Sequence, residues 1–254
     1  MLYYIHGKEK DMSKVIIVES KNGADNVDKS RQATNVSNLN EDRKQWQKIV
    51  NGDAKSKVIP TLLSRLEKNY EYYGFAQKED IDFPAVQKLA KAYIDADAWL
   101  QINYCRDSTR QSIDESVQTA TIKEYVNDTF TSIPNGKEVP FNGTIVSKKE
   151  ANGLNGKQVK ARSVDAVGQI NDRNVKIFQK YSKVSGSGQS HQTLETQNWL
   201  EEVLKINDDT MIFVAQLDGA EAESHIPELR KLIADTDNVF VGNSEEVIDW
   251  LNSH

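Results

Sequence analysis

The sequence lacks the features of disulfide-stabilised and membrane-spanning proteins. Cys105 is the single cysteine, which excludes an internal disulfide and a zinc cluster built on thiolates. No run of about 18 apolar residues is present, so no helix is expected to cross a membrane. The N-terminus shows no apolar stretch followed by a small-residue cleavage site, as a signal peptide would. We therefore expect a soluble protein of the reducing cytoplasm.

Nucleotide and metal motifs are missing as well. Gly186-Ser187-Gly188 does not have the spacing of a dinucleotide-binding or P-loop motif, and the four histidines show no metal-ligand spacing. What is present is the composition of an ordinary globular protein, with 254 residues of which 38% are hydrophobic and 28% charged. Such a chain can bury a sizeable core.

Charge is unevenly distributed along the chain. The formal net charge is −6, yet residues 160–183 carry six Lys or Arg against two Asp or Glu. Residues 184–254 carry three against fourteen. A positive segment with an acidic flank suits an active site that faces phosphate on a domain whose other surfaces serve solubility. The net negative charge alone favours a small-molecule enzyme that does not bind DNA.

The first 160 residues predict mainly helices. Helical spacing of apolar residues covers 40–50, 58–73, 83–99 and 112–130. A polar segment at 21–40 is typical of a loop or a mobile arm that orders on binding DNA. Recurrent Pro, Gly and Asn over 133–160 indicate turns between short strands. The four tryptophans lie in helical patterns and are expected in cores.

The C-terminal third alternates between strands and helices. Strands are predicted over 163–168, 174–181, 211–216 and 239–241, with a turn at Asn171-Asp172. Helices are predicted over 192–205, 227–234 and 244–251, the last capped by Ser244. This alternation predicts an α/β layer with at least two parallel neighbouring strands.

This order of elements resembles the core of the PD-(D/E)XK nuclease superfamily, type II restriction endonucleases in particular. Asp165 stands where the family has its first metal-binding carboxylate, KYSKVSGSGQSHQ is similar to the loop after the second catalytic strand, and VFVGNSEEVIDWL is similar to the closing strand and helix. The resemblance implies an α/β (α+β) fold with a restriction-endonuclease-like central mixed sheet flanked by helices. Residues 161–254 would form this core. Residues 1–160 would form a mainly helical region for DNA recognition and dimerisation, unless the chain folds as one compact domain.

The resemblance also implies a chemistry. The protein would hydrolyse double-stranded DNA with Mg²⁺ as a homodimer, Asp165 would bind the metal, Gln179 would bind or orient it, and Lys180 would stabilise the transition state. The family's Glu-x-Lys is absent, because no carboxylate lies on residues 175–181. Glu150 or Glu195 can supply it from elsewhere. Lys180 or Lys183 can supply the cation if a bulge near Ser182 redirects the strand end.

Polar residues near the hairpin and in one upstream turn are candidates for DNA contacts. Arginine and glutamine suit guanine and adenine edges, and the remaining types suit phosphates. The candidates are Arg106, Arg110, Gln111, Lys183, Ser185, Ser187, Gln189 and His191.

Three alternatives stay open. Glu19-Ser20-Lys21 matches the family motif better than the hairpin does, with Asp11 upstream, but helices rather than alternating strands follow it. Asp165 can instead be a solvated carboxylate at a strand edge. The missing glutamate also allows a nuclease-like DNA-binding module that has lost catalysis.

Overall fold

The computed structural model describes residues 2–5, 14–96, 110–133, 138–155, 162–183, 189–234 and 236–254. The chain divides into two compact units. The first, here called the sheet unit, comprises Met1–Tyr4, Ile16–Ser30 and Thr109–His254, and the second, the helical unit, comprises Ile5–Val15 and Arg31–Ser108. The sheet unit thus includes three stretches before residue 161, namely Met1–Tyr4, Ile16–Ser30 and residues 109–160, together with the C-terminal third.

A five-stranded mixed sheet forms the centre of the sheet unit. Its order is β3 (Thr131–Ser132), β6 (Ala166–Ile170), β7 (Arg173–Tyr181), β8 (Met211–Asp218) and β9 (Val239–Gly242). β6 is antiparallel to both of its neighbours, β3 and β7, whereas β7, β8 and β9 run parallel. The predicted central mixed sheet with at least two parallel neighbouring strands is therefore confirmed.

Local sequence explains the β6–β7 hairpin. Asn171 adopts a left-handed φ of 50° in the predicted turn, which asparagine tolerates better than most residues, and Ile170 pairs with Arg173 across it. On β6, a Cβ at Gly168 would lie 2.3 Å from the Phe130 ring, so glycine is needed for that ring to pack on the strand.

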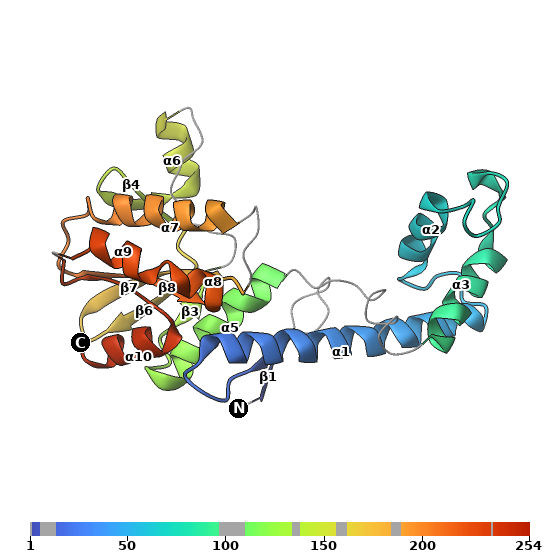
Figure 1. The fold of residues 1–254 in the computed structure, drawn as a ribbon, viewed down its shortest axis with the longest axis horizontal. Coiled ribbons are helices and arrows are strands. Elements are labelled where there is room, and N and C mark those ends of the chain that lie inside the picture. Colours follow the sequence, from blue (N-terminus) through green and yellow to red (C-terminus); the bar gives the residue numbers. More distant parts are fainter. Residues whose placement is uncertain are drawn as a thin grey trace. The chain divides into compact units, whose positions relative to one another are not determined.

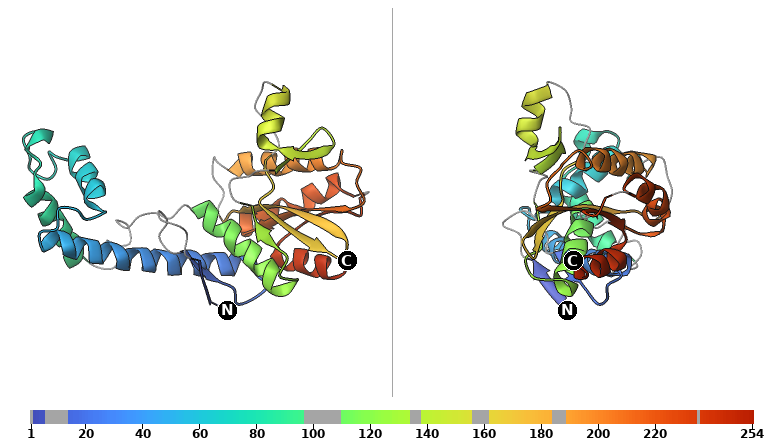
Figure 2. Two further views of the ribbon diagram at one scale, coloured as in Figure 1. Left: turned by 180° about the vertical axis from the view of Figure 1, so that it is seen from behind. Right: turned by 90° about the vertical axis from the view of Figure 1, so that its left-hand side faces the viewer.

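Helices cover both faces of the sheet (Figures 1 and 2). One face packs against α7 (Gln189–Val203), α8 (Ala220–Ser224) and α9 (Ile226–Leu232), and the other against α5 (Arg110–Tyr125) and α10 (Ser244–Asn252). Alternation along β7 sends Phe178 into the first core and Ile177 into the second. Trp199 is fully buried and stacks on Phe178 at 5.4 Å, as its helical pattern predicts.

Two further two-stranded sheets complete the strands of the described residues. β4 (Glu138–Phe141) and β5 (Thr144–Ser147) form a hairpin, which confirms the predicted short strands. The chain then forms helix α6 (Lys148–Asn155) where further turns were expected. β1 (Leu2–Ile5) pairs with β2 (Lys14–Ile17).

The predicted polar arm is wrong, because residues 23–50 form one long helix, α1 (Gly23–Val50). The stripe that its first part buries against residues 15–19 is polar: Asn26, Ser30 and Thr34 are at most 1% exposed. Four residues of a helix span about 6 Å along its axis, and two residues of a strand span about 6.6 Å. Helix side chains spaced four residues apart can therefore each contact every second residue of a strand that lies alongside the helix. Their oxygens accept hydrogen bonds of 2.9–3.1 Å from the N–H groups of Glu19, Ile17 and Val15, respectively. Hydropathy does not detect such a stripe.

The helical unit has its own apolar core. α2 (Ile59–Lys68), the short 3₁₀ turn η1 (Lys78–Asp80) and α3 (Phe83–Asp95) follow the second part of α1. Trp46 is 1% exposed and packs against Tyr93. The predicted helix over 58–73 ends five residues early, at Lys68. In the described parts of the chain, no helix has the length and apolar character that crossing a membrane requires.

Candidate active site

The carboxyl ends of β7 and β8 form the edge at which the candidate site lies. Tyr181 and Asp218 are the last residues paired between these parallel strands. Gly219 follows with φ 91°, and a Cβ there would lie 2.5 Å from the Ser182 carbonyl oxygen. That close approach lets the Ser182 carbonyl accept from the N–H of Glu221 at 3.1 Å, at the start of α8. Ligand sites in α/β sheets commonly lie beyond such strand ends.

Asp165 lies at an irregularity of the β6–β7 ladder. Its N–H donates to the Ile177 carbonyl at 2.8 Å, although Ala166 is the residue that pairs with Ile177. Asp165 and Ala166 thus both lie opposite the single residue Ile177. This is the arrangement of a β-bulge, which changes the direction of a side chain. The Asp165 carboxylate accepts from the Gln179 N–H at 2.8 Å, in place of a backbone acceptor. The bulge expected near Ser182 is not found there, since β7 and β8 pair continuously to the strand ends.

The environment of Asp165 favours its protonated form. Burial raises the pKa of this carboxyl from 3.8 to about 7, opposed by the hydrogen bond from the Gln179 N–H. The negative charge of Glu115 raises the pKa further, whereas Lys180 and Arg162 lower it. In the metal-free protein the group therefore titrates near neutral pH, as active-site carboxyls often do.

Lys180 lies between aromatic and acidic neighbours on the α7 side of β7. Its ammonium is 3.7 Å from a carboxylate oxygen of Glu195, which α7 contributes, and 4.9 Å from the centre of the Phe178 ring. Arg162 forms an ion pair with the other Glu195 oxygen. The Lys180 and Glu195 side chains are 11% and 19% exposed, so solvent screens them only in part. Asp165, Glu195, Lys180 and Arg162 are called the Asp165 cluster below.

A second set of polar residues lies on the opposite side of β7 and is fully buried. The Asp218 carboxylate accepts from the Ser244 N–H (2.9 Å) and hydroxyl (2.7 Å), from Gln118 (2.7 Å) and from Gln216 (3.2 Å). Burial raises the pKa of Asp218, while the hydrogen bonds from Gln118 and Ser244 oppose that rise. A Cβ at Gly23 would lie 2.0 Å from the Ser244 hydroxyl, so only glycine fits there at the start of α1.

The sequence predicted that Ser244 caps α10, but the Ser244 hydroxyl donates to Asp218 instead. Asn243 is the cap, accepting from the Glu246 N–H at 3.0 Å, and the Glu246 side chain returns a hydrogen bond to the Asn243 N–H. Asp218, Gln118, Gln216, Ser244 and Gln179 are called the Asp218 network below.

Gln179 belongs to this network rather than to the face that carries Lys180. The side-chain NH₂ of Gln216 donates to Asp218, so the side-chain oxygen of Gln216 faces Gln179. The side-chain NH₂ of Gln179 donates to this oxygen at 2.9 Å. The Gln179 oxygen lies 3.1 Å from the Thr119 hydroxyl, and the residue is 1% exposed. Its backbone N–H contacts Asp165, but its side chain lies apart from Lys180. The arrangement does not favour the predicted role of the Gln179 side chain as a metal ligand.

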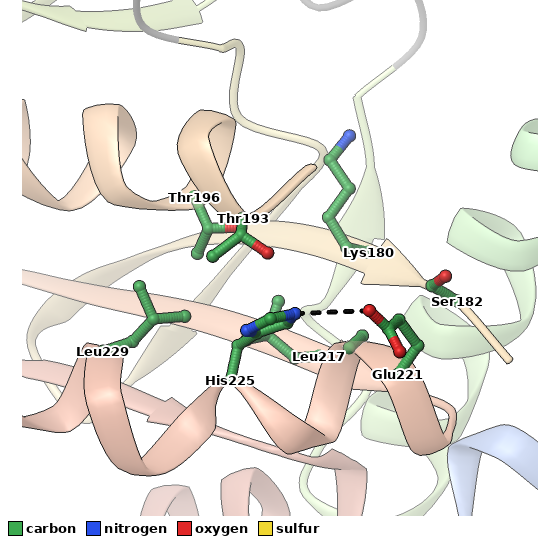
Figure 3. Close-up of a pocket in the computed structure, with 9 residues that line it drawn as sticks. Lys180, Ser182, Thr193, Thr196, Leu217, Glu221, His225 and Leu229 are labelled. Atoms are coloured by element: carbon green, nitrogen blue, oxygen red, sulfur yellow. Dashed lines mark ion pairs between the residues drawn. The ribbon is translucent and has the colours of Figure 1, made fainter. Parts of the chain in front are cut away.

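A small pocket opens beside Lys180 on the α7 side of the sheet (Figure 3). His225 and Glu221 lie 3.5 Å apart along its floor, and Thr193 and Thr196 of α7 line the opposite wall. Its volume of about 10 Å³ is the space of a single water molecule. It is too small to be a substrate pocket, so substrate would have to meet Lys180 from outside.

The predicted DNA contacts are only partly described by the structure. Lys183 is exposed and its ammonium lies 2.6 Å from an oxygen of Asp28 on α1. Arg110 and Gln111 begin α5, and Gln189 and His191 lie in the first turn of α7, but their side chains lie outside the described residues. The remaining predicted contacts, Arg106, Ser185 and Ser187, lie outside the described residues altogether.

The two charged residues of the alternative motif Glu19-Ser20-Lys21 form separate exposed ion pairs and not a cluster of carboxylates. Glu19 forms an exposed ion pair with Lys29 at 2.5 Å, and Lys21 forms another with Asp249 at 2.6 Å. Asp11 lies outside the described residues. Glu150, the other suggested source of a carboxylate, is exposed on α6. Of the two suggestions for the missing carboxylate, Glu195 is the residue found beside Lys180.

The carboxylates of the Asp165 cluster have the chemistry of a magnesium site. Within the described ranges, no group of three or more His, Cys, Asp or Glu side chains is arranged to hold a metal. Mg²⁺ needs fewer protein ligands, because it keeps several waters and is commonly held by one or two carboxylates together with substrate phosphate. Asp165 and Glu195 supply hard oxygen donors of that kind.

Comparisons of the chain with models of protein families, with curated proteins and with solved structures gave no match. The functional argument therefore depends on the geometry described above.

Proposed function

We propose that the sheet unit is a Mg²⁺-dependent endonuclease for double-stranded DNA, similar to type II restriction enzymes and acting as a homodimer. The observation that carries the proposal is that Lys180 lies beside Glu195 and near Asp165, whose pKa its charge lowers, at one end of the β6–β7 hairpin. Strand order supports it, since an antiparallel hairpin, a helix and a parallel strand follow one another as in the superfamily that the sequence resembles. Two-fold symmetry would suit a palindromic target.

Each residue of the Asp165 cluster has a role in this proposal. Asp165 and Glu195 would hold the metal, which when bound supplies a Lewis acid and lowers the pKa of a coordinated water. Lys180, fixed by Phe178 and Glu195, would stabilise negative charge that develops on the phosphate. Arg162 would bind a phosphate oxygen in exchange for Glu195.

The charge of the metal-free cluster also suits phosphate. Lys180 and Arg162 carry two positive charges, Glu195 one negative charge, and Asp165 is partly protonated near neutral pH because its pKa is about 7. The cluster is therefore net positive although the protein is negative overall. Local potential of this kind attracts an anionic substrate.

A DNA-binding module without catalysis is the second candidate. The family motif has a carboxylate two positions before its lysine, on the same face of the strand. Phe178 occupies that position before Lys180, and this favours the second candidate. In that case Glu195 would serve only to neutralise Lys180 and Arg162.

One assay separates the two candidates. Purified protein is incubated with mixed duplex DNA, methylated and unmethylated, with Mg²⁺, Mn²⁺ or EDTA, and both retention and cutting are measured on gels. The nuclease proposal expects metal-dependent cutting that Asp165→Ala abolishes and that Asp172→Ala, in the exposed hairpin turn, leaves intact. Retention without cutting in any metal supports the binding module, and neither retention nor cutting at low salt rejects both.

A further inference from the structure

The carboxylate of Asp28 joins two donors that follow Lys180 along the chain. One oxygen of Asp28 accepts from the Tyr181 hydroxyl at 2.7 Å, and the other lies 2.6 Å from the Lys183 ammonium. Tyr181 ends β7 and Lys183 lies two residues beyond it. All three residues belong to the sheet unit, although Asp28 comes from α1 at the opposite end of its sequence.

These two donors are of the type that proteins use to hold DNA phosphates. Tyrosine hydroxyls and lysine ammonium groups commonly donate to phosphate oxygens, and such contacts set the position of the duplex. Asp28 presents two anionic oxygens across both donors, much as one phosphate group would. Tyr181 and Lys183 are therefore already held in the arrangement that an anion with two oxygens requires.

The Asp28 contact is one that a phosphate can replace. The side chains of Lys183 and Asp28 are 64% and 41% exposed, and exposed ion pairs contribute little to stability because solvent screens them. Duplex DNA offers a regular row of phosphates, so a second one can meet this pair of donors while the first meets Lys180.

We infer that Tyr181 and Lys183 form a backbone-phosphate subsite for duplex DNA, which Asp28 occupies in the free protein. The inference rests on the proposed function, because it takes DNA to approach the same end of β7. Asp28 would then compete with DNA and lower the affinity for every sequence alike, since phosphate contacts carry no base information.

Equilibrium binding to a fluorescent duplex in EDTA tests the inference without requiring cleavage. Asp28→Asn is compared with Asp25→Asn, which removes the same charge from an exposed position one turn earlier on α1. We expect Asp28→Asn to tighten binding about three- to ten-fold, and Asp25→Asn less than about two-fold. Lys183→Gln should weaken binding and reduce the slope of log affinity against log salt by about 0.9.

The double variants give the sharper readout. Once Lys183→Gln and Tyr181→Phe have removed the donors, Asp28→Asn should tighten binding no more than Asp25→Asn does. Equal effects of Asp28→Asn and Asp25→Asn in an otherwise native protein that binds DNA would overturn the subsite and leave the proposed function standing. If no variant binds duplex even at low salt, the proposed function falls, and the subsite falls with it.

Discussion

Two polar clusters meet at strand β7, and they differ in burial and in how their central carboxylates are hydrogen-bonded. The Asp218 network is buried, and its carboxylate receives hydrogen bonds from three different side chains and one backbone N–H. The Asp165 cluster is partly exposed, has more positive than negative charge, and contains a carboxyl whose pKa is about 7. A buried carboxylate that receives several hydrogen bonds helps to hold a fold together, whereas a partly exposed cluster with excess positive charge can still bind a ligand.

The largest effect is expected from breaking the Asp218 network. Asp218→Ala removes the acceptor of Ser244, Gln118 and Gln216 in a site without water access, and we expect a loss of roughly 3–5 kcal/mol in the free energy of unfolding. Chemical denaturation followed by circular dichroism measures it. Asp218→Asn, which keeps one acceptor oxygen, should lose less. A loss below about 1 kcal/mol for the alanine variant would show that the network is not a structural anchor.

Activity should depend on the other cluster. Lys180→Met should reduce metal-dependent DNA cleavage by about 100-fold or more, because it removes the positive charge that stabilises the reacting phosphate. Glu195→Gln should have an effect of similar size, because it removes a proposed metal ligand. Gln179→Met should destabilise the fold but leave cleavage within about ten-fold, since its side chain lies on the opposite side of β7. Initial cleavage rates, measured at a temperature where all variants are folded, decide this. The assignment is wrong if Gln179→Met loses activity and Glu195→Gln does not.

The smallest effect is a dependence of stability on pH. In the folded metal-free protein the Asp165 carboxyl keeps its proton up to a pKa of about 7, but in the unfolded chain it releases the proton near 3.8. Folded protein therefore binds more protons between these values, and its stability falls as pH rises from about 4 to 7. Asp165→Asn should remove this fall, raising stability at pH 8 by about 1–2 kcal/mol, a figure reduced for the partial exposure of the site.

Denaturation in EDTA at pH 5 and pH 8 measures that difference. Asp172→Asn, in the exposed turn of the same hairpin, provides the control and should behave as the native protein does. Parallel pH profiles for the native protein and Asp165→Asn would contradict the raised pKa.

Much of the sheet unit could be predicted from the sequence because its elements follow local rules. The hairpin, with Asn171 in its turn, and the apolar strands β8 and β9 lie where alternation and turn residues indicate. The first part of helix α1, before residue 40, was missed because Ser30 and Thr34 bury hydroxyls against a strand backbone, and a helical segment with a polar buried stripe has no apolar period.

The candidate site was predictable only in part. Asp165 and Lys180 follow from the hairpin pattern, whereas Gln179 and Lys180 are adjacent on a strand and therefore face opposite sides of the sheet. Glu195 is fifteen residues from Lys180 in sequence and meets it only because α7 packs over β7. One signal in the sequence is available: Glu195 lies in the first half of a helix that begins just after the positive segment.

The most direct test asks which cluster binds the metal. Mn²⁺ binding is titrated by electron paramagnetic resonance in the native protein and in Asp165→Asn, Glu195→Gln and Gln179→Met. We expect the native protein and Gln179→Met to bind Mn²⁺ alike, and the two carboxylate variants to bind it at least ten-fold more weakly. Undiminished binding in both carboxylate variants, or loss confined to Gln179→Met, would contradict the assignment of the site to the Asp165 cluster.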